Sequence, residues 1–380
     1  MNLDHKPHFV IFSVTEKGSM LAKELEALLK SHFNNVGPDF EPTFKRYSNS
    51  DVKASGGLAK VVSQTFCEMP PVGQSAFETR NQTILIFTCA VGIAVRMLAP
   101  YVSDKLKDPA CIVLDDHARF AISLLSGHIG KANAYAHLIA DCLSPSHQTL
   151  PVITTATDTR GIEGFEEVMT HFRINLEKNR HVIKTLNAAL VEGQTIGLLV
   201  DPFIRSKKGI DHQTVTCYED TNAFFNHQGP RVVISLRKPE KWLKHLYDDC
   251  CYIFYSQSLV LGTGCRKAVP YKAYYQQLIE ALSFESFSIN AIGAISSVRL
   301  KAEEMCINKL SETLNVPFIT HEATALSPFT GFFEGSDFVE KTTGIRSIAG
   351  PSAYILSQDE LTFKIYKKEK CTFSFGRIEL

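Results

Sequence analysis

The sequence predicts a multi-domain α/β protein whose amino-terminal part is a three-layer domain built on a largely parallel sheet. Short apolar runs typical of buried strands alternate with segments of helical spacing. Glycine-containing turns follow several of these runs. The chain has 380 residues, which is too long for one ordinary core and sufficient for two or three packed domains.

The amino-terminal segment, residues 1–162, shows the clearest alternation. An apolar run at 8–14 precedes leucines at helical spacing between 19 and 33. The later expected strands are 83–87, 110–115, 120–125 and 151–155, and the later expected helices are 93–98 and 133–143. We therefore interpret this segment as an α/β domain.

Two further segments follow. Residues 163–256 are interpreted as a small middle α/β domain, with a helix at 175–192 and strands at 194–200, 231–236 and 251–256. Residues 257–380 alternate again, with strands at 258–261, 289–295 and 316–320 and helices at 270–282 and 299–314. This pattern predicts a carboxy-terminal open α/β domain.

Composition excludes several classes of protein. Lys plus Arg equals Asp plus Glu at 40 each, and no block of one sign indicates binding to nucleic acid or anionic lipid. No apolar stretch reaches the roughly 18 residues that span a bilayer, and the polar start is unlike a signal peptide. We expect a cytoplasmic protein. The 10 cysteines have no zinc spacing, which predicts that most are buried reduced thiols and that the protein has no metal site.

Candidate binding residues follow the strands. In parallel sheets ligands bind beyond the carboxyl ends of strands, where turns expose N–H groups at helix starts. Four segments have suitable residues there: Thr88–Gly92 with Arg96, Ser126–Asn133, Thr154–Asp158 and Gly262–Arg266. We expect them to form one or two anion-binding crevices.

Each of these segments also has a structural interpretation. A glycine after a strand is most often only a turn. Arg96 is as well placed to pair with Asp115 as to bind a substrate carboxylate, and Asp158 suits a turn or cap as well as catalysis. The stretch around Lys105 is typical of a solvated loop. Lys267 stands where a GxGxxG fingerprint needs its third glycine, so NAD binding is not supported.

The order of motifs resembles the cobalt-precorrin-5A hydrolase family of the anaerobic cobalamin pathway. In the amino-terminal domain the resemblance is carried by Val91–Arg96, Ala99–Tyr101, Asp104–Lys105, Asp108–Pro109, Asp115, Arg119–Phe120, Ile122–His128, Ala132–Asn133 and Thr154–Asp158. In the carboxy-terminal domain it is carried by Leu261–Arg266, Lys301 with Glu304, and Gly344–Ser347. The resemblance covers nearly the whole chain.

The resemblance implies a hydrolase that opens the ring-A lactone of a cobalt-corrinoid intermediate with release of acetaldehyde. Cobalt then arrives inside the substrate, and no cofactor is expected. Lactone opening needs an activated water and donors for the developing oxyanion. His128 is the leading general base, because imidazole titrates near neutrality, and Asp158 orients His128 or replaces it. The expected substrate-binding residues are Gly92, Arg96, Lys105, Ser126, Gly127, Asn133, Thr154, Thr155, Thr157, Gly262, Gly264 and Arg266.

Other functions stay open at this point. The same crevices would suit a non-catalytic carrier of corrinoid intermediates, and a generic phosphate-ligand α/β enzyme would share the fold alone. A homodimer and transient contacts with neighbouring pathway enzymes also stay open.

Overall fold

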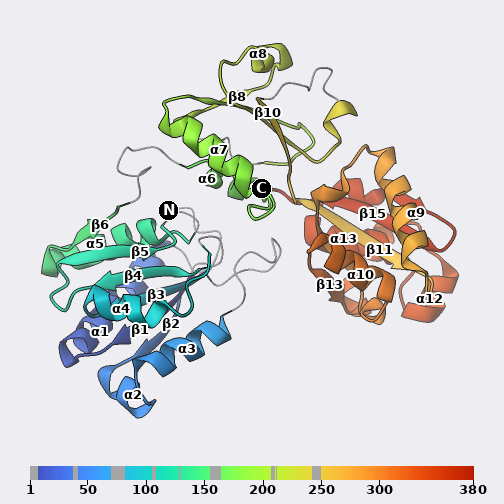
Figure 1. Ribbon diagram of the computed structural model, residues 1–380. Helices are drawn as coiled ribbons and strands as arrows, with labels where there is room; N and C mark the ends of the chain where they lie inside the picture. Colours follow the sequence, from blue (N-terminus) through green and yellow to red (C-terminus); the bar gives the residue numbers. More distant parts are fainter. Residues whose placement is uncertain are drawn as a thin grey trace. The chain divides into compact units, whose positions relative to one another are not determined.

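The computed structural model describes residues 7–36, 42–69, 82–104, 108–127, 130–154, 164–206, 210, 212–241 and 250–380. These residues form two compact units, the first ending at Glu167 and the second beginning at Val168. Three separate sheets with flanking helices are visible in Figure 1. One sheet lies in each predicted segment, and the boundaries at 162 and 256 stay predictions. The predicted multi-domain α/β class is confirmed.

The first unit is built on a six-stranded sheet of order β2-β1-β3-β4-β5-β6. Its strands are β1 (Pro7–Ser13), β2 (Thr43–Tyr47), β3 (Gln82–Thr88), β4 (Ala110–Leu114), β5 (Phe120–Leu125) and β6 (Leu150–Val152). Its helices are α1 (Glu16–Val36), α2 (Asn49–Ala54), α3 (Leu58–Glu68), α4 (Val91–Leu98) and α5 (Ala132–His147). The sequence patterns do not predict β2, α2 or α3. For β2 the reason is that this edge strand is half-exposed and of mixed polarity.

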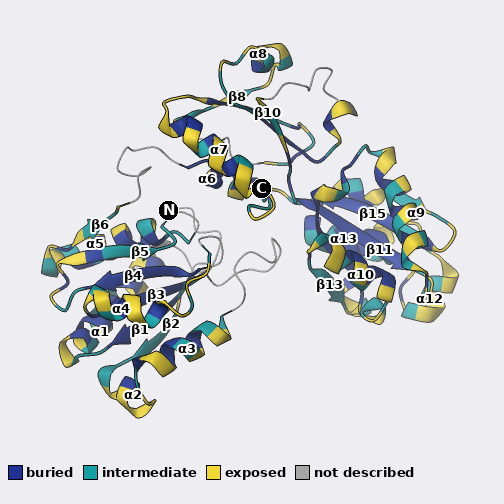
Figure 2. Ribbon diagram, viewed as in Figure 1, coloured by how far each residue is buried: buried dark blue, intermediate teal, exposed yellow. Residues whose placement is uncertain are grey.

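Helices cover both faces of this sheet. Phe9 and Ile11 of β1 point into one core with α1 and α5, whereas Val10 and Phe12 point into the other with α3 and α4. Figure 2 shows buried strands beneath helices whose outer faces are exposed. This alternation confirms the predicted three-layer domain.

One strand direction departs from an all-parallel sheet. Strands β2, β1, β3 and β4 are parallel, but β5 runs antiparallel to β4, and β6 then runs parallel to β5. The reversal is made by a tight turn, in which Asp115 accepts hydrogen bonds from the N–H of Phe120 at 2.9 Å and from Arg119 Nε at 3.0 Å. The carboxyl ends of β5 and β6 therefore lie at the edge opposite to those of β1, β3 and β4.

The second unit contains two sheets. The middle sheet, order β10-β9-β7-β8, is parallel throughout. It is formed by β7 (Ile196–Val200), β8 (Val215–Tyr218), β9 (Arg231–Ser235) and β10 (Cys251–Tyr255), with α6 (Glu166–His171), α7 (Arg180–Val191), α8 (Thr221–Phe225) and the 3₁₀ turn Pro239–Lys241. The predicted strands at 194–200, 231–236 and 251–256 are confirmed.

The carboxy-terminal sheet has the order β13-β12-β11-β15-β14. Its strands are β11 (Leu259–Cys265), β12 (Ile292–Val298), β13 (Phe318–His321), β14 (Ile365–Lys367) and β15 (Cys371–Arg377). Its α-helices are α9 (Tyr271–Phe284), α10 (Met305–Leu314), α11 (Ala323–Leu326), α12 (Asp337–Thr343) and α13 (Ala349–Ser357). Short 3₁₀ helices lie at Ile289–Ala291, Arg299–Lys301, Ser327–Phe332 and Glu360–Phe363. The predicted βαβαβ order is confirmed, and two antiparallel strands, β14 and β15, extend it.

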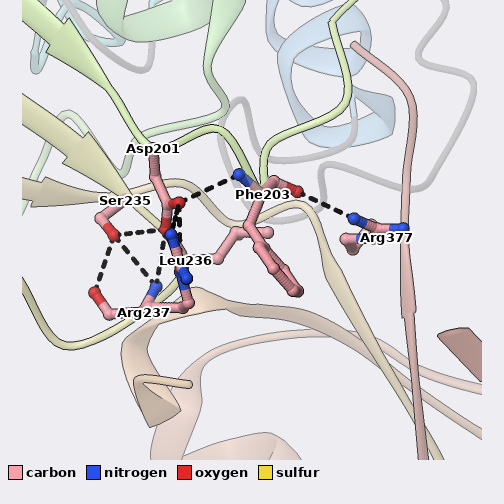
Figure 3. A network of polar contacts seen from close by, with 6 residues as sticks. All are labelled: Asp201, Phe203, Ser235, Leu236, Arg237 and Arg377. Atoms are coloured by element: carbon pink, nitrogen blue, oxygen red, sulfur yellow. Dashed lines mark hydrogen bonds and ion pairs between the residues drawn. The ribbon is translucent and has the colours of Figure 1, made fainter. Parts of the chain in front are cut away.

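A buried carboxylate organises the second unit. Asp201, directly after β7, is fully buried and pairs with Arg237 at 2.6 Å. It also accepts hydrogen bonds from Ser235 Oγ at 2.7 Å and from the N–H of Phe203 at 3.0 Å, as Figure 3 shows. Burial raises the pKa of Asp201, but hydrogen bonds from Arg237, Phe203 and Ser235 outweigh this effect and lower it below its ordinary value. The carboxylate is thus ionised and satisfied.

This network reaches the carboxy-terminal sheet through Phe203. The Cζ atoms of Arg237 and Arg377 lie 4.5 Å and 5.2 Å from the centre of the Phe203 ring. Arg377 ends β15, donates to the Phe203 carbonyl at 3.4 Å and pairs with Asp359 at 2.7 Å. Each cation–π contact contributes about 0.5–2 kcal/mol. The two sheets of the second unit are therefore joined by charge, ring and backbone contacts.

We predict that Asp201→Ala lowers the stability of the second unit by about 3 kcal/mol, because it leaves the Arg237 guanidinium without its buried partner. Urea denaturation followed by circular dichroism measures the effect. The matched control is Asp337→Ala, since Asp337 pairs with Arg346 but its side chain is 83% exposed, and we expect a loss below about 1 kcal/mol there. Equal losses of stability in both variants would show that the buried Asp201–Arg237 pair stabilises the protein no more than the exposed pair does.

A second prediction concerns acid. The pKa of Asp359 is also lowered, because hydrogen bonds from Arg377 outweigh burial. A depressed pKa in the folded state stabilises at pH values above the unfolded pKa of about 3.9 and loses that effect as pH falls through the folded value. The urea midpoint should therefore be level from about pH 7 to 5 and fall below about pH 4. The urea midpoint of Asp201→Asn should fall less than that of the wild type over the same pH range. A wild-type midpoint at pH 3 equal to that at pH 7 would contradict the link between these carboxylates and stability.

Candidate active site

Hydrogen bonds hold the residues after β5 at the edge of the first sheet where β5 and β6 end, which is the β5–β6 edge. Ser126 has a φ of 58°, and its Oγ donates to the Asp108 carbonyl at 2.7 Å. Its own carbonyl accepts the N–H of Ala132, the first residue of α5, at 3.1 Å. A Cβ on Gly130 would lie 2.6 Å from Ser126 Cβ. The loop is thus bound to both the strand end and the helix start.

Asn133 lies over Gly127. The N–H of Asn133 donates to the Gly127 carbonyl at 3.1 Å, and its Oδ1 accepts from Ser123 Oγ at 2.6 Å. A Cβ on Gly127 would lie 2.7 Å from the same Oδ1. The sequence therefore needs glycine at 127 because a side-chain amide occupies the space beside it.

The segment before β4 reaches the same edge. The buried carboxylate of Asp108 accepts from the N–H groups of Ser103 at 3.0 Å and Asp104 at 3.2 Å. These contacts close the two ends of the segment that contains Lys105, which itself lies outside the described residues. Because β6 runs parallel to β5, with Val152 opposite Ile122, Thr154 lies at this edge, two residues beyond β6. Thr154 is exposed.

Several predicted site residues cannot be placed. His128, Thr155, Thr157 and Asp158 lie outside the described residues, so their proposed roles stay predictions. In sequence, His128 comes directly after Gly127 and Asp158 comes four residues after Thr154. The described neighbours Ser126, Gly127, Asn133 and Thr154 are brought to one edge.

Gly92 and Arg96 do not join this edge, so the segments expected to form one or two crevices lie at two different edges of the first sheet. Both belong to α4, which follows the carboxyl end of β3. Arg96 Nη1 donates to the Gly92 carbonyl at 2.9 Å, so the guanidinium lies at the first turn of that helix. Since β5 is antiparallel to β4, roughly 15 Å of strand separates the two edges. Within the described residues Arg96 forms no ion pair with Asp115, whose partner is Arg119.

Gly262 and Gly264 are not in a turn, contrary to the prediction. Both lie in β11, which pairs with β12 on one side and β15 on the other. A Cβ on Gly262 would overlap the carbonyl oxygen of Ala349 in α13, so this glycine permits close packing of the helix on the strand. Arg266, just beyond β11, is exposed, and its N–H donates to the Lys370 carbonyl at 2.8 Å.

The sequence patterns miss a cluster at the carboxyl edge of the third sheet. Cys265 ends β11, and Cys306 lies in the first turn of α10, with their Sγ atoms 3.9 Å apart. Glu304 pairs with Lys301 at 2.9 Å and accepts the N–H of Ala268 at 3.2 Å. The hydrogen bond from the Cys265 thiol lowers the pKa of Cys306 against the effect of burial. The resemblance includes Lys301 and Glu304 but not Cys306.

These features define a multi-domain α/β protein with polar residues beyond the ends of several strands. Residues 74–158 match the family model described as Cobalamin synthesis G N-terminal, and residues 259–376 match the one described as Cobalamin synthesis G C-terminus. The chain is 32% identical over 380 residues to cobalt-precorrin-5A hydrolase of Salmonella typhimurium, which covers 99% of both chains. It belongs to the cobalt-precorrin-5A hydrolase family.

Two more distant relatives agree. Cobalt-precorrin-5A hydrolase of Priestia megaterium is 24% identical over 298 residues, covering 78% of this chain and 77% of that protein. Probable cobalt-precorrin-5A hydrolase of Methanocaldococcus jannaschii is 24% identical over 294 residues, covering 77% of this chain and 81% of that one. No helix in the described part of the chain is long and apolar enough to cross a membrane.

We predict that Gly127→Ala reduces activity and that Asn133→Ala, in the same chain, partly restores it. The added methyl would meet the Asn133 amide at 2.7 Å, and removal of the amide relieves that overlap. A double-mutant cycle should give a coupling of about 1 kcal/mol or more in thermal stability, with the same sign in turnover. Additive effects would show that the two residues do not share this space.

Proposed function

We propose that this chain is a cobalt-precorrin-5A hydrolase. It would open the ring-A lactone of a cobalt-corrinoid intermediate and release acetaldehyde. The observation that carries the proposal is the 32% identity to the Salmonella typhimurium enzyme across 99% of both chains. The hydrogen bonds that hold Ser126 to Asp108 and Ala132 support it, because an ordered backbone positions catalytic groups better than a free one does.

The proposed first step is addition of water to the lactone carbonyl. His128 accepts a proton from that water as general base, and Asp158 orients the imidazole or acts in its place. N–H groups of the Gly127 turn and the hydroxyls of Thr154, Thr155 and Thr157 donate to the developing oxyanion. The carbonyl–oxygen bond then breaks and gives a carboxylate and an alcohol. The freed alcohol next loses a proton, and cleavage of its carbon–carbon bond expels acetaldehyde, with the macrocycle accepting the electron pair.

Substrate carboxylates need cations. We assign the peripheral acetate and propionate arms of the macrocycle to Lys105 and Lys131. Lys105 is three residues before Asp108, which bonds to Ser126, and Lys131 directly precedes α5. Gly92 and Arg96 lie at the opposite edge of the sheet, so they belong to a different part of any binding surface. Gly262 and Gly264 are part of β11. Arg266, just beyond this strand, is exposed and carries a positive charge.

The proposal predicts that His128→Ala and Asp158→Ala each lower turnover by at least ~100-fold. Anaerobic incubation with cobalt-precorrin-5A, with acetaldehyde measured over time, gives the rate. His117→Ala is the matched control, because this exposed histidine follows β4 at the other edge, where it contacts Lys17, and we expect an unchanged rate. Wild-type acetaldehyde release by His128→Ala would remove His128 from the mechanism.

The same assay separates the alternative of a non-catalytic carrier. A carrier would bind the cobalt-corrinoid without releasing acetaldehyde, whereas a hydrolase would release one acetaldehyde for each substrate consumed. A cytoplasmic location, a homodimer, contacts with neighbouring pathway enzymes and the lack of a cofactor for this reaction accompany the proposal as predictions. Size-exclusion chromatography with light scattering tests the dimer.

A further inference from the structure

Three metal-ligating side chains converge in the second unit. The ligand atoms of Cys265, Glu304 and Cys306 all lie within 4.8 Å of one another. They come from the end of β11, the residue before α10 and the first turn of α10. Two regular elements thus hold all three ligands.

The sulfur separation fits chelation of one ion. Two thiolates about 2.3 Å from a zinc ion and 3.9 Å from each other subtend an angle of about 115°, close to tetrahedral. A disulfide requires an S–S distance of about 2.05 Å, so the sulfurs would have to approach by nearly 2 Å. The observed distance favours a shared ion over a covalent bond.

The surroundings fix the third ligand. One Glu304 oxygen lies 2.9 Å from Lys301 Nζ, and the other accepts the N–H of Ala268 at 3.2 Å. The side chains of Lys301 and Glu304 are each only 12% exposed. The carboxylate is therefore oriented before any ion binds, which reduces the entropy cost of binding.

The charges balance around a divalent cation. Two thiolates and one carboxylate carry three negative charges, which a divalent ion and the Lys301 ammonium neutralise together. Cys306 is 2% exposed, whereas Cys265 and Glu304 are half-buried, so an ion can enter from the side of Cys265. Thiolates prefer zinc and similar soft cations to magnesium or calcium.

We propose that Cys265, Glu304 and Cys306 bind one thiophilic divalent cation, with zinc the best fit. Three protein ligands leave the fourth tetrahedral position for water or an added ligand. The site differs from the cobalt carried by the substrate, and the proposal departs from the sequence prediction of no protein metal site. It does not depend on the proposed hydrolase activity.

The full chain, reduced and stripped with a chelator, is titrated with Zn²⁺ alone against a chromophoric competitor, and with Co²⁺ alone in an absorption cell. We expect one ion per chain and a thiolate-to-cobalt charge-transfer band. Cys265→Ser and Cys306→Ser should each weaken Zn²⁺ binding by at least ~100-fold, more than the loss of an outer-shell partner. Cys142→Ser, a half-buried cysteine of α5, is the matched control and should bind like the wild type.

A second readout uses the wild-type chain and does not depend on variant folding. Zn²⁺ should protect the half-buried Cys265 from alkylation, mapped by peptide mass, while the exposed Cys67 and Cys250 react equally with and without the ion. No Zn²⁺ binding by the wild type, or unchanged binding by the double serine variant, would overturn the proposal. A Cys265–Cys306 disulfide that forms in air, with no protection by zinc, would also overturn it and assign the pair to redox chemistry.

Discussion

The hydrogen-bonded turn at Asp115 is the constraint on which the geometry of the first unit depends. By accepting from Phe120 and Arg119, its carboxylate reverses the chain between β4 and β5. The reversal sends the segments after β5 and β6 toward the start of β4, where Ser126 bonds to Asp108. The chain reversal at this turn therefore determines which loops adjoin one another and separates them from Arg96.

The second unit depends on a different kind of interaction, a fully buried charge. Asp201 joins the end of β7 to the segment after β9, and the Phe203 ring extends the contact to Arg377 at the end of β15. Both guanidinium groups lie near the Phe203 ring, and the ring also packs against Phe287, so the two sheets share a junction of polar and aromatic contacts. Such a junction is specific in orientation, because each hydrogen bond has one geometry.

Much of this fold is predictable from sequence, and the failures have identifiable causes. The apolar runs at 8–14 and 83–87 indicated buried strands because helices cover both faces. The antiparallel direction of β5 can also be predicted, since the short link after residue 115 cannot form a parallel crossover, which needs about ten residues or more.

The prediction of a turn at Gly262 and Gly264 was wrong, because in sequence a glycine required by a neighbouring helix cannot be told from a glycine in a turn. Cys265 and Cys306 lie far apart in sequence, so no spacing motif could join them. The roles of His128 and Asp158 came from family resemblance alone.

The close approach of α13 to β11 has a wider meaning for this architecture. Where Gly262 faces the Ala349 carbonyl, helix and strand touch backbone to backbone, so no side chain sets the spacing of the layers. Any larger residue at position 262 would push α13 away from β11, because its Cβ would overlap the Ala349 carbonyl oxygen. The packing of α13 on β11 therefore restricts position 262 to glycine in sequences that adopt this fold. The need for glycine at position 262 reflects the short distance between helix and strand, not a role in catalysis.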